Sequence, residues 1–372
     1  MIYLDNAATT RMYDEVIDVE KEVEKNFFAN PSALHSFGME AENLIKKSRK
    51  TIAKELGCDE SEVYFTKGAT ESNNIIISSF SSQENTALTS SIEHSSVFDA
   101  FNNFSYKEVK YLKCDNYGFI DLEDLKNSLD ESTKLVSIIY VNNETGTIQN
   151  IKEISKIVKS YNKDIFLHID ATQGLGKVNC KVADLGVDGL SFSGHKIHGP
   201  KGIGGLYVNK DFIGKISPVL YGGRQESISS GTYNSPAIVA LGKALEMMKS
   251  KNEGAYIKEL NFYLRDLISK NIDDYLFISP KDNVSYYILD VAFSNIKSEV
   301  LLHMLEDEEI YVSSGSACSK GAESRILKSL NVPQDYIDGA IRFSFSSDIS
   351  KDDLDKTVKV LKNSIKIIRK VM

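Results

Sequence analysis

Apolar runs of strand length alternate with stretches of helical periodicity through the first two thirds of the chain. Four runs are predicted to be buried strands: residues 135–141, 165–169, 188–192 and 205–208. Between the first two, apolar residues recur on one face of a predicted helix: Ile151, Ile154, Ile157 and Val158. This order predicts a mostly parallel sheet covered by helices.

The pattern changes after about residue 250. A long helix is followed by a strand near 286–291, a helix from about Glu299 and a strand at 341–345. Ser350 and Asp353 form a capping-box-like start to a last helix with a regular apolar face: Leu354, Val358, Leu361, Ile365 and Ile368. This third of the chain is predicted to form a second, smaller α+β domain.

At 372 residues the chain is long enough for two hydrophobic cores. Its composition, 42% hydrophobic and 26% charged, is that of a globular protein, and no apolar run is long enough to span a bilayer. The first five residues lack the basic start and apolar stretch of a signal peptide, so we expect a cytoplasmic protein. A net charge of −8 argues against direct nucleic-acid binding and favours small-molecule chemistry.

The cysteines lack the paired spacing of a zinc site or a disulfide framework: Cys58, Cys114, Cys180 and Cys318. Reduced thiols are therefore expected, and no metal site is predicted. The first three are expected to be small core residues.

Two residues that could share one ligand follow two of the predicted strands. Asp170 ends the strand at 165–169, and Lys196 follows the strand at 188–192. Strand ends of this kind meet at one edge of an α/β sheet, where ligands bind. Pyridoxal phosphate (PLP) needs both groups, because a carboxylate keeps its ring nitrogen protonated and a lysine forms the resting Schiff base. Taken alone, the pair is weak evidence, since an aspartate at a strand end is more often a turn or helix cap and a lysine in a loop is usually solvated.

A candidate phosphate site lies earlier in the chain, where Gly68, Ala69 and Thr70 occupy a predicted strand-to-helix turn. Free backbone N–H groups at a helix start bind anions, and the Thr70 hydroxyl would add a donor. An ordinary glycine turn before a capped helix is the alternative interpretation.

These segments together resemble the class-V aminotransferase family, and specifically its group I cysteine desulfurases. The resemblance runs almost from end to end and is carried by residues 3–10, 30–32, 68–72, 93–94, 141–144, 168–173, 191–196, 313–318 and 341–344. It implies a homodimeric α/β enzyme with the fold of the fold-type I PLP-dependent transferases. The implied large PLP-binding domain covers residues 14–249, and the implied small domain is built from 1–13 and 250–372.

The resemblance also implies the reaction and the role of each candidate residue. L-cysteine would be converted to L-alanine, and its sulfur would pass as a persulfide to a protein acceptor in tRNA thiolation or iron–sulfur cluster assembly. Lys196 would bind PLP, Asp170 would face the ring nitrogen, and His94 would stack on the ring and assist proton transfers. Asn143 and Gln173 would hold the ring hydroxyl and the substrate side. The implied phosphate ligands are Gly68, Ala69, Thr70, Ser193, His195 and, from the second subunit, Thr232.

Two further residues would act on the substrate. Arg342 would clamp the substrate carboxylate, since a guanidinium fork matches a carboxylate with two parallel hydrogen bonds. Cys318 lies among small residues on a predicted exposed, flexible loop, suited to reach the substrate and then an acceptor. Because the thiolate is the nucleophile, a nearby cation or base should assist Cys318. This cysteine separates a desulfurase from a generic PLP enzyme.

Three features depart from the family's pattern. Ser229 stands where the family usually has an arginine, and Arg224 where it usually has a glycine, so we expect either a weakened phosphate site or compensation by Arg224. The stretch from Cys318 to Ser324 is slightly shorter than in the best-known members. The chain also ends at Met372, without the tail that grips an iron–sulfur scaffold in those members, which favours a tRNA-thiolation enzyme as acceptor.

Two other functions fit the same residues. A lyase for selenocysteine or another β-substituted amino acid would use the same ring chemistry, and only substrate kinetics separates it from a desulfurase. A catalytically impaired paralogue that acts as a binding partner is suggested by Ser229. The joint presence of the candidate catalytic residues argues against this second alternative: Lys196, Asp170, His94, Arg342 and Cys318.

Overall fold

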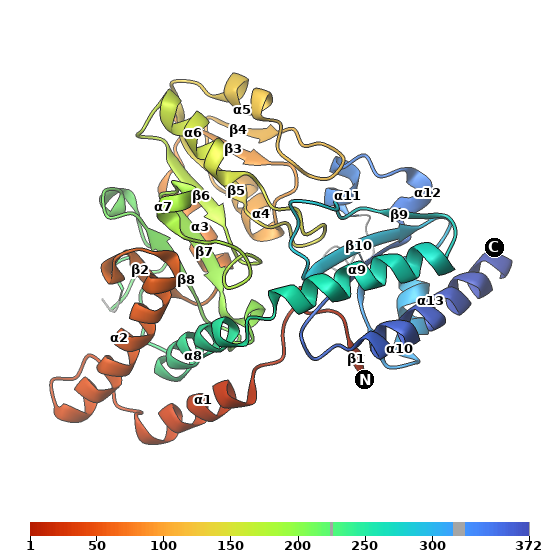
Figure 1. The fold of residues 1–372 in the computed structure, drawn as a ribbon. Helices are drawn as coiled ribbons and strands as arrows, with labels where there is room; N and C mark the ends of the chain where they lie inside the picture. The colour runs from red at the N-terminus through yellow and green to blue at the C-terminus, as the bar shows by residue number, and fades with distance from the viewer. Residues whose placement is uncertain (224–225, 315–323, 372) are drawn as a thin grey trace.

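The structure, a computed structural model, describes residues 1–223, 226–314 and 324–371 (Figure 1). Its largest sheet contains β2 (Val63–Thr66), β3 (Thr86–Ser90), β4 (Glu108–Leu112), β5 (Thr133–Ile139), β6 (Phe166–Asp170), β7 (Gly189–Ser193) and β8 (Gly204–Val208). The strand order is β2-β8-β7-β6-β5-β3-β4. Strands β3 to β7 run parallel, whereas β8 is antiparallel to both of its neighbours. The predicted mostly parallel sheet is therefore confirmed.

Helices cover both faces of this sheet (Figure 1). They are α1 (Asp14–Asn26), α2 (Ser36–Leu56), α3 (Ala69–Ser79), α4 (Ser95–Asn103), α5 (Leu122–Ser128), α6 (Ile151–Tyr161), α7 (Val182–Leu185) and α8 (Ser235–Lys251), with 3₁₀ turns η1 (Glu60–Glu62), η2 (Gly194–Lys196) and η3 (Ile213–Lys215). Successive strand residues point to opposite faces. Leu167 of β6 accordingly packs in the cluster that includes α2, α6 and α8, and Phe166 packs in the cluster that includes α3 and α4.

A smaller antiparallel sheet has the order β12-β13-β10-β9. Its strands are β9 (Tyr275–Phe277), β10 (Ile288–Phe293), β12 (Ser313–Ser314) and β13 (Ala340–Ser344). The accompanying helices are α9 (Gly254–Asn271), α10 (Ser298–Glu306), α11 (Arg325–Ser329), α12 (Gln334–Ile337) and α13 (Lys351–Val371). The predicted second α+β unit is therefore present.

The N-terminus joins this smaller unit. Strand β1 (Ile2–Tyr3) pairs in parallel with β11 (Ile310–Tyr311), and Figure 1 shows the N-terminus beside α10. Ile2 and Leu4 pack in the same apolar cluster as the inner faces of α9, α10 and α13. The predicted domain limits at 13/14 and 249/250 stay predictions.

The capping box predicted for the last helix is confirmed. Ser350 N donates to Asp353 Oδ2 at 2.9 Å, and Asp353 N donates to Ser350 Oγ at 3.2 Å. The strand predicted at 135–141 runs too far, because β5 ends at Ile139. Tyr140 and Val141 are buried, which accounts for their apolar side chains. Beyond the strand, Tyr140 N still donates to Asp170 O, and Val141 bridges to Ile148.

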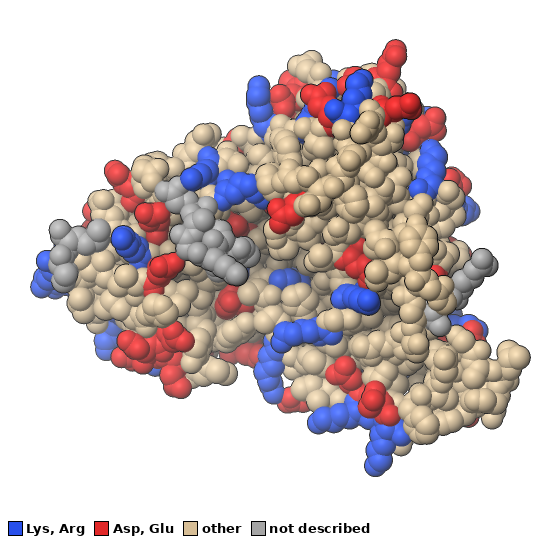
Figure 2. All heavy atoms as spheres, turned by 180° about the vertical axis from the view of Figure 1, so that it is seen from behind, with Lys and Arg blue, Asp and Glu red and all other residues tan. Residues whose placement is uncertain are grey.

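The surface carries both signs of charge, which lie interspersed around the face drawn in Figure 2. Within the described ranges, no helix combines the length and the apolar character needed to cross a membrane.

Candidate active site

A cavity of about 380 Å³ opens where β5, β6 and β7 end. Most of the predicted site residues line it: Ala69, Thr70, His94, Asn143, Asp170, Gln173, Ser193, His195, Lys196 and Arg342. Gly68 lines a neighbouring open groove. Thr232 is exposed and lines neither space. Cys318 and Arg224 lie outside the described residues.

Asp170 is held as a hydrogen-bond acceptor at the end of β6. Its Oδ1 accepts from Thr172 N, and its Oδ2 accepts from Asn73 Nδ2, both at 2.9 Å. Only 3% of Asp170 is exposed. A buried carboxylate that accepts two hydrogen bonds is suited to face a cationic ring nitrogen.

Lys196 reaches the N-terminal strap, the segment Asp5–Thr9 that follows β1. Lys196 Nζ donates to Ala7 O at 2.6 Å and to Ala8 O at 2.7 Å. Gln173 Nε2 also donates to Ala7 O, at 2.8 Å. The strap therefore closes one side of the cavity over the candidate lysine.

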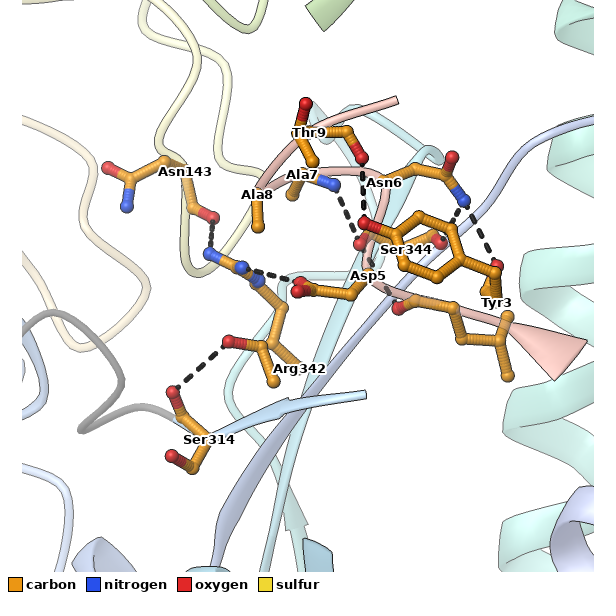
Figure 3. Close-up of polar contacts among 12 residues, drawn as sticks. Tyr3, Asp5, Asn6, Ala7, Ala8, Thr9, Asn143, Ser314, Arg342 and Ser344 are labelled. Atoms are coloured by element: carbon orange, nitrogen blue, oxygen red, sulfur yellow. Dashed lines mark hydrogen bonds and ion pairs between the residues drawn. The ribbon is translucent and has the colours of Figure 1, made fainter. Parts of the chain in front are cut away.

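The strap also contacts Arg342 on β13 (Figure 3). Arg342 Nη2 lies 3.0 Å from Asp5 Oδ1, and Arg342 Nη1 donates to Asn143 O at 2.8 Å. The strap is fixed to the smaller sheet by Asn6 and Ala7, which donate to Ser344 O and Ser344 Oγ. The guanidinium is thereby oriented from two sides.

In the turn before α3 the backbone lies very close to the neighbouring strand β8. Gly68 has a φ of +146°, which a side chain rarely allows, and a Cβ on Gly204 of the adjacent strand would lie 2.7 Å from Gly68 Cα. The N-cap residue Gly68 has no side chain to cap α3, and Ala69 N donates instead to Ser193 Oγ at 2.9 Å. Ser229 is nearly buried, and its hydroxyl donates to Glu71 Oε1 at 2.8 Å. It thus ties into this helix end without adding a positive charge.

Burial and neighbouring charges perturb the titrating groups around the cavity. Burial lowers the pKa of His195 to about 4, and the cations Lys196 and Lys201 act in the same direction. Burial likewise raises the pKa of Glu144, whose carboxylate accepts from Ser324 Oγ at 2.8 Å. The shift of His195 favours a neutral imidazole beside the cavity at neutral pH, and the shift of Glu144 makes its carboxyl group harder to ionise.

Asp290 is a buried acid on β10, in register with Arg342 of β13. Neither of its carboxylate oxygens meets a hydrogen-bond donor within the described part of the chain. Burial, with Glu144 nearby, raises its pKa to about 8. Because this folded-state value exceeds the unfolded one, the native protein retains the proton from about pH 4 to about pH 8. The contribution of Asp290 to the free energy of unfolding therefore decreases as pH rises through this range.

We expect Asp290→Asn to remove this pH dependence, because an amide does not ionise. Between about pH 5 and about pH 8 the wild type should lose up to roughly 4 kcal/mol of its free energy of unfolding through Asp290. Urea unfolding at both pH values measures the difference, with the exposed Asp282→Asn as the control that should follow wild type. An unchanged pH dependence in Asp290→Asn would show that Asp290 is already ionised in the fold.

Three cysteines are reduced and are poor candidates for catalysis. Burial raises the pKa of Cys58 and of Cys114 to about 12, and raises that of the fully buried Cys180 further. Their prediction as core residues agrees with their packing against the main apolar cluster. Among the described residues no group of histidines, cysteines and acids could hold a metal ion.

Among the site residues that the predicted set missed are Asp5, Asn73, Ser96 and Thr172. Asp5, Ser96 and Thr172 line the cavity, and Asn73 binds Asp170 from α3. Asp5, Asn73 and Thr172 fall inside or beside the motifs quoted above, whereas Ser96 lies two positions after His94. Their position in or near these motifs could have marked these residues as part of the site, but it does not indicate what each of them does.

The residues present fit PLP. Asn143 Oδ1 and Thr172 Oγ1 are buried polar atoms of cavity-lining residues, and neither has a hydrogen-bond partner within the described residues. Such atoms call for a polar ligand, because an unpaired buried polar group costs stability. A carboxylate, an amine and a helix N-terminus around the same cavity match the ring nitrogen, the aldehyde and the phosphate of this cofactor.

Comparison with known proteins places the chain in a family. It matches the class-V aminotransferases over residues 2–357. It is 39% identical over 382 residues to the cysteine desulfurase IscS of Dictyoglomus turgidum, which covers 100% of this chain and 96% of that protein. The solved structure of a NifS-like protein matches with a TM-score of 0.91 at 34% identity, covering 98% of this chain and 99% of that one. The structure of SspA in complex with cysteine matches with a TM-score of 0.80 at 32% identity, covering 93% and 99%.

These matches confirm the predicted family, fold class and enzyme class. The agreement in fold extends over both sheets, since nearly the whole chain is covered. The roles of the individual site residues stay predictions. The chain belongs to the class-V aminotransferase family and, within it, to the PLP-dependent cysteine desulfurases.

Proposed function

We propose that this enzyme holds PLP on Lys196 and moves the sulfur of L-cysteine to Cys318, leaving L-alanine. One observation carries the proposal: Lys196, Asp170 and Arg342 line a single cavity. They supply an amine, a carboxylate and a guanidinium, which are the groups that a PLP enzyme acting on an amino acid needs.

Asp170, Lys196 and the α3 turn would hold the cofactor. Asp170 would pair with the ring nitrogen, and Asn143 and Gln173 would serve the ring hydroxyl. Thr70, Ser193 and His195, with the backbone of the α3 turn at Gly68 and Ala69, would bind the phosphate. When bound, PLP supplies an electrophilic aldehyde and a ring that accepts the electron pair released when the α-proton of the substrate leaves.

Arg342 would orient the substrate by its carboxylate. It is nearly buried, so water competes little for its N–H groups, and Asp5 and Asn143 already restrict its rotation. A charge-assisted pair in such a place is worth roughly 1.5 to 3 kcal/mol. The structure of SspA in complex with cysteine supports an amino-acid substrate for a protein of this fold.

Lys196 would move the α-proton. Its amine would act as the base over a short distance when the substrate amine is held by the cofactor. The carbonyls of Ala7 and Ala8 lie where they can accept its N–H groups, which keeps the amine beside the cavity.

Cys318 would take the sulfur. Its Sγ attacks the substrate sulfur, the substrate Cβ–S bond breaks, and a new S–S bond forms. The electron pair of the broken bond stays on carbon, which takes up a proton to become the methyl group of alanine. Support comes from the flanking residues: Ser314, four positions before Cys318, lines the cavity, and Ser324, six positions after it, bonds the cavity-lining Glu144.

Product identity tests this reaction. Incubated with L-cysteine, the purified enzyme should release alanine, because the sulfur leaves to a thiol and the carbon skeleton keeps its amine. Pyruvate as the main product would instead indicate a β-eliminating lyase. A matched assay with selenocysteine measures the preference between the two substrates through their kcat/KM ratio.

We also propose that the sulfur passes from Cys318 to a cysteine of a protein that serves tRNA thiolation or iron–sulfur cluster assembly. The relatives support sulfur transfer in general and name no acceptor. Trapping partner proteins on the Cys318 persulfide would identify the acceptor.

A homodimer completes the proposal, with Thr232 reaching the PLP phosphate of the neighbouring subunit. Thr232 is exposed and lies outside the cavity of its own chain, which supports a role in trans. Removal of one donor to a charged phosphate costs roughly 1.5 kcal/mol, or about tenfold in affinity. Thr232→Ala should therefore weaken PLP binding by about that factor.

Mixed dimers distinguish action in trans from action in cis. A dimer of one Thr232→Ala chain and one Lys196→Ala chain contains one site with both Lys196 and a partner threonine. In this mixed dimer the Thr232→Ala chain should bind PLP with the wild-type affinity. The amount of PLP that borohydride traps on that chain measures this binding. An affinity that stays low in the mixed dimer would place Thr232 at its own chain's site or at no site.

A further inference from the structure

A chain of hydrogen bonds connects Asp170 to His94 through two residues that were not predicted to belong to the site. Its middle members are Asn73 in α3 and Ser96 in the first turn of α4. Asn73 Nδ2 lies 2.9 Å from both Asp170 Oδ2 and Ser96 Oγ. Ser96 Oγ in turn lies 2.9 Å from His94 Nδ1. Asn73 is fully buried, so water does not compete for its two bonds.

The chemistry of Asp170 sets the direction of every bond. An ionised carboxylate only accepts, so the Asn73 amide must turn its nitrogen toward Asp170. Its second hydrogen then goes to Ser96 Oγ, which leaves the single proton of the Ser96 hydroxyl for His94 Nδ1. The Ser96 backbone N–H donates to the same ring nitrogen at 3.1 Å.

Two donors therefore converge on His94 Nδ1. A ring nitrogen that accepts hydrogen bonds carries no proton, so the neutral ring must carry its proton on Nε2. A second proton, on Nδ1, would face both donors, which disfavours the imidazolium form.

The groups around His94 shift its pKa in both directions. Burial lowers the pKa of His94 and is the largest effect. Asp170 at the end of β6 and Asp99 in α4 raise this pKa, whereas Lys196 in η2 and Arg325 in α11 lower it. Burial dominates, and the neutral ring is the favoured form.

We propose that Asn73 and Ser96 are positioning residues that hold His94 as the neutral Nε2–H tautomer. With Nδ1 engaged by Ser96, Nε2–H is the ring group left for the cavity that His94 lines. His94 then meets its ligand as a hydrogen-bond donor, and removal of the α-proton falls to the Lys196 amine. The proposal rests on the proposed function in one respect, namely that His94 contacts cofactor or substrate.

Helix capping explains part of the same geometry. His94 is the N-cap residue of α4, and its ring accepts the Ser96 backbone N–H. Any residue at position 96 other than proline supplies that N–H. The Ser96 hydroxyl and the Asn73 amide are not needed for the cap, so a variant without the hydroxyl separates capping from tautomer control.

The tautomer can be observed by NMR on the full-length protein as purified, with isotope-labelled histidine. The chain has six histidines, and the resonances of His94 are those that vanish in His94→Gln. In the wild type we expect an unprotonated Nδ1 and a protonated Nε2 near neutral pH. A protonated Nδ1 in the wild type would overturn the proposal by itself, whatever the variants do.

Ser96→Ala supplies the second measurement. It removes one of the two donors to Nδ1, so the preference for the Nε2–H tautomer should fall by roughly tenfold and the ring should titrate at a higher pH than in wild type. Ser96→Thr keeps a hydroxyl and should restore both properties. Ser95→Ala removes the neighbouring exposed hydroxyl and should change neither.

Ser96→Ala spectra that match the wild type would reject the role of the hydroxyl. The readout does not depend on turnover, so it is distinct from a failure of the proposed function. If PLP were trapped on another lysine, the proposed function would fail while the tautomer measurement kept its meaning.

Discussion

Replacement of Lys196 by alanine is expected to leave the enzyme without covalently held PLP and to reduce alanine production at least a thousandfold, on the scale of lost nucleophilic and acid–base catalysis. The reason is that one amine serves two purposes, the covalent link to the cofactor and the transfer of the α-proton. Borohydride reduction followed by peptide mapping measures the first effect, and amino-acid analysis of the product measures the second.

The controls for Lys196→Ala come from two other lysines near the site. Lys201 is exposed, five positions along the chain, and Lys201→Ala should retain the trapped cofactor. Burial lowers the pKa of Lys177 to about 7, so this lysine is partly unprotonated at neutral pH and is the natural competitor. Trapped cofactor on Lys177 would show that the wrong lysine has been assigned.

Replacement of Cys318 by alanine should separate substrate binding from sulfur transfer. The variant should still bind cysteine, because binding relies on Arg342 and Lys196. It should form no persulfide and release alanine at least a thousandfold more slowly, since it has lost its covalent nucleophile. Absorption spectra with added cysteine report binding, and alanine analysis reports turnover.

The other thiols provide matched controls for Cys318→Ala. The raised pKa values of Cys58 and Cys180 leave very little thiolate at neutral pH. Cys58→Ala and Cys180→Ala should therefore keep near wild-type turnover. If Cys180→Ala folded normally and lost activity, the sulfur would be carried by a different thiol.

The N-terminal strap links the two halves of the site. It contacts Arg342 through Asp5 and Lys196 through Ala7 and Ala8, while β1 is paired with β11. A ligand that draws Arg342 toward its own carboxylate therefore acts on a segment that also holds the amine of Lys196.

The sheet was predictable where strands are buried on both faces. Apolar runs placed β5, β6, β7 and β8 to within two residues of their observed limits, because such strands have no solvent-facing polar positions. Strand β3 did not stand out from its sequence, although it is fully buried. It contains threonine and serine, and Thr89 satisfies its hydroxyl by donating to Ser137 O at 2.9 Å.

The site was predictable as far as strand ends determine it. Asp170 and Lys196 lie at the same edge because β6 and β7 are parallel neighbours. Asp5 could not be placed in this way, because its position depends on the pairing of Ile2 with Ile310, which are far apart in sequence. The contact between Asn73 and Ser96 depends likewise on how α3 packs against α4, which the side chains of an apolar cluster decide.

The most direct test of sulfur transfer from cysteine to Cys318 is a single-turnover experiment with sulfur-labelled L-cysteine and no reductant or acceptor. The labelled protein is alkylated, digested and mapped by mass spectrometry, and alanine is counted in parallel. We predict one labelled sulfur on the peptide that contains Cys318 for each alanine released. Alanine formed with the label on another cysteine, or with no label on the protein, would contradict the assignment.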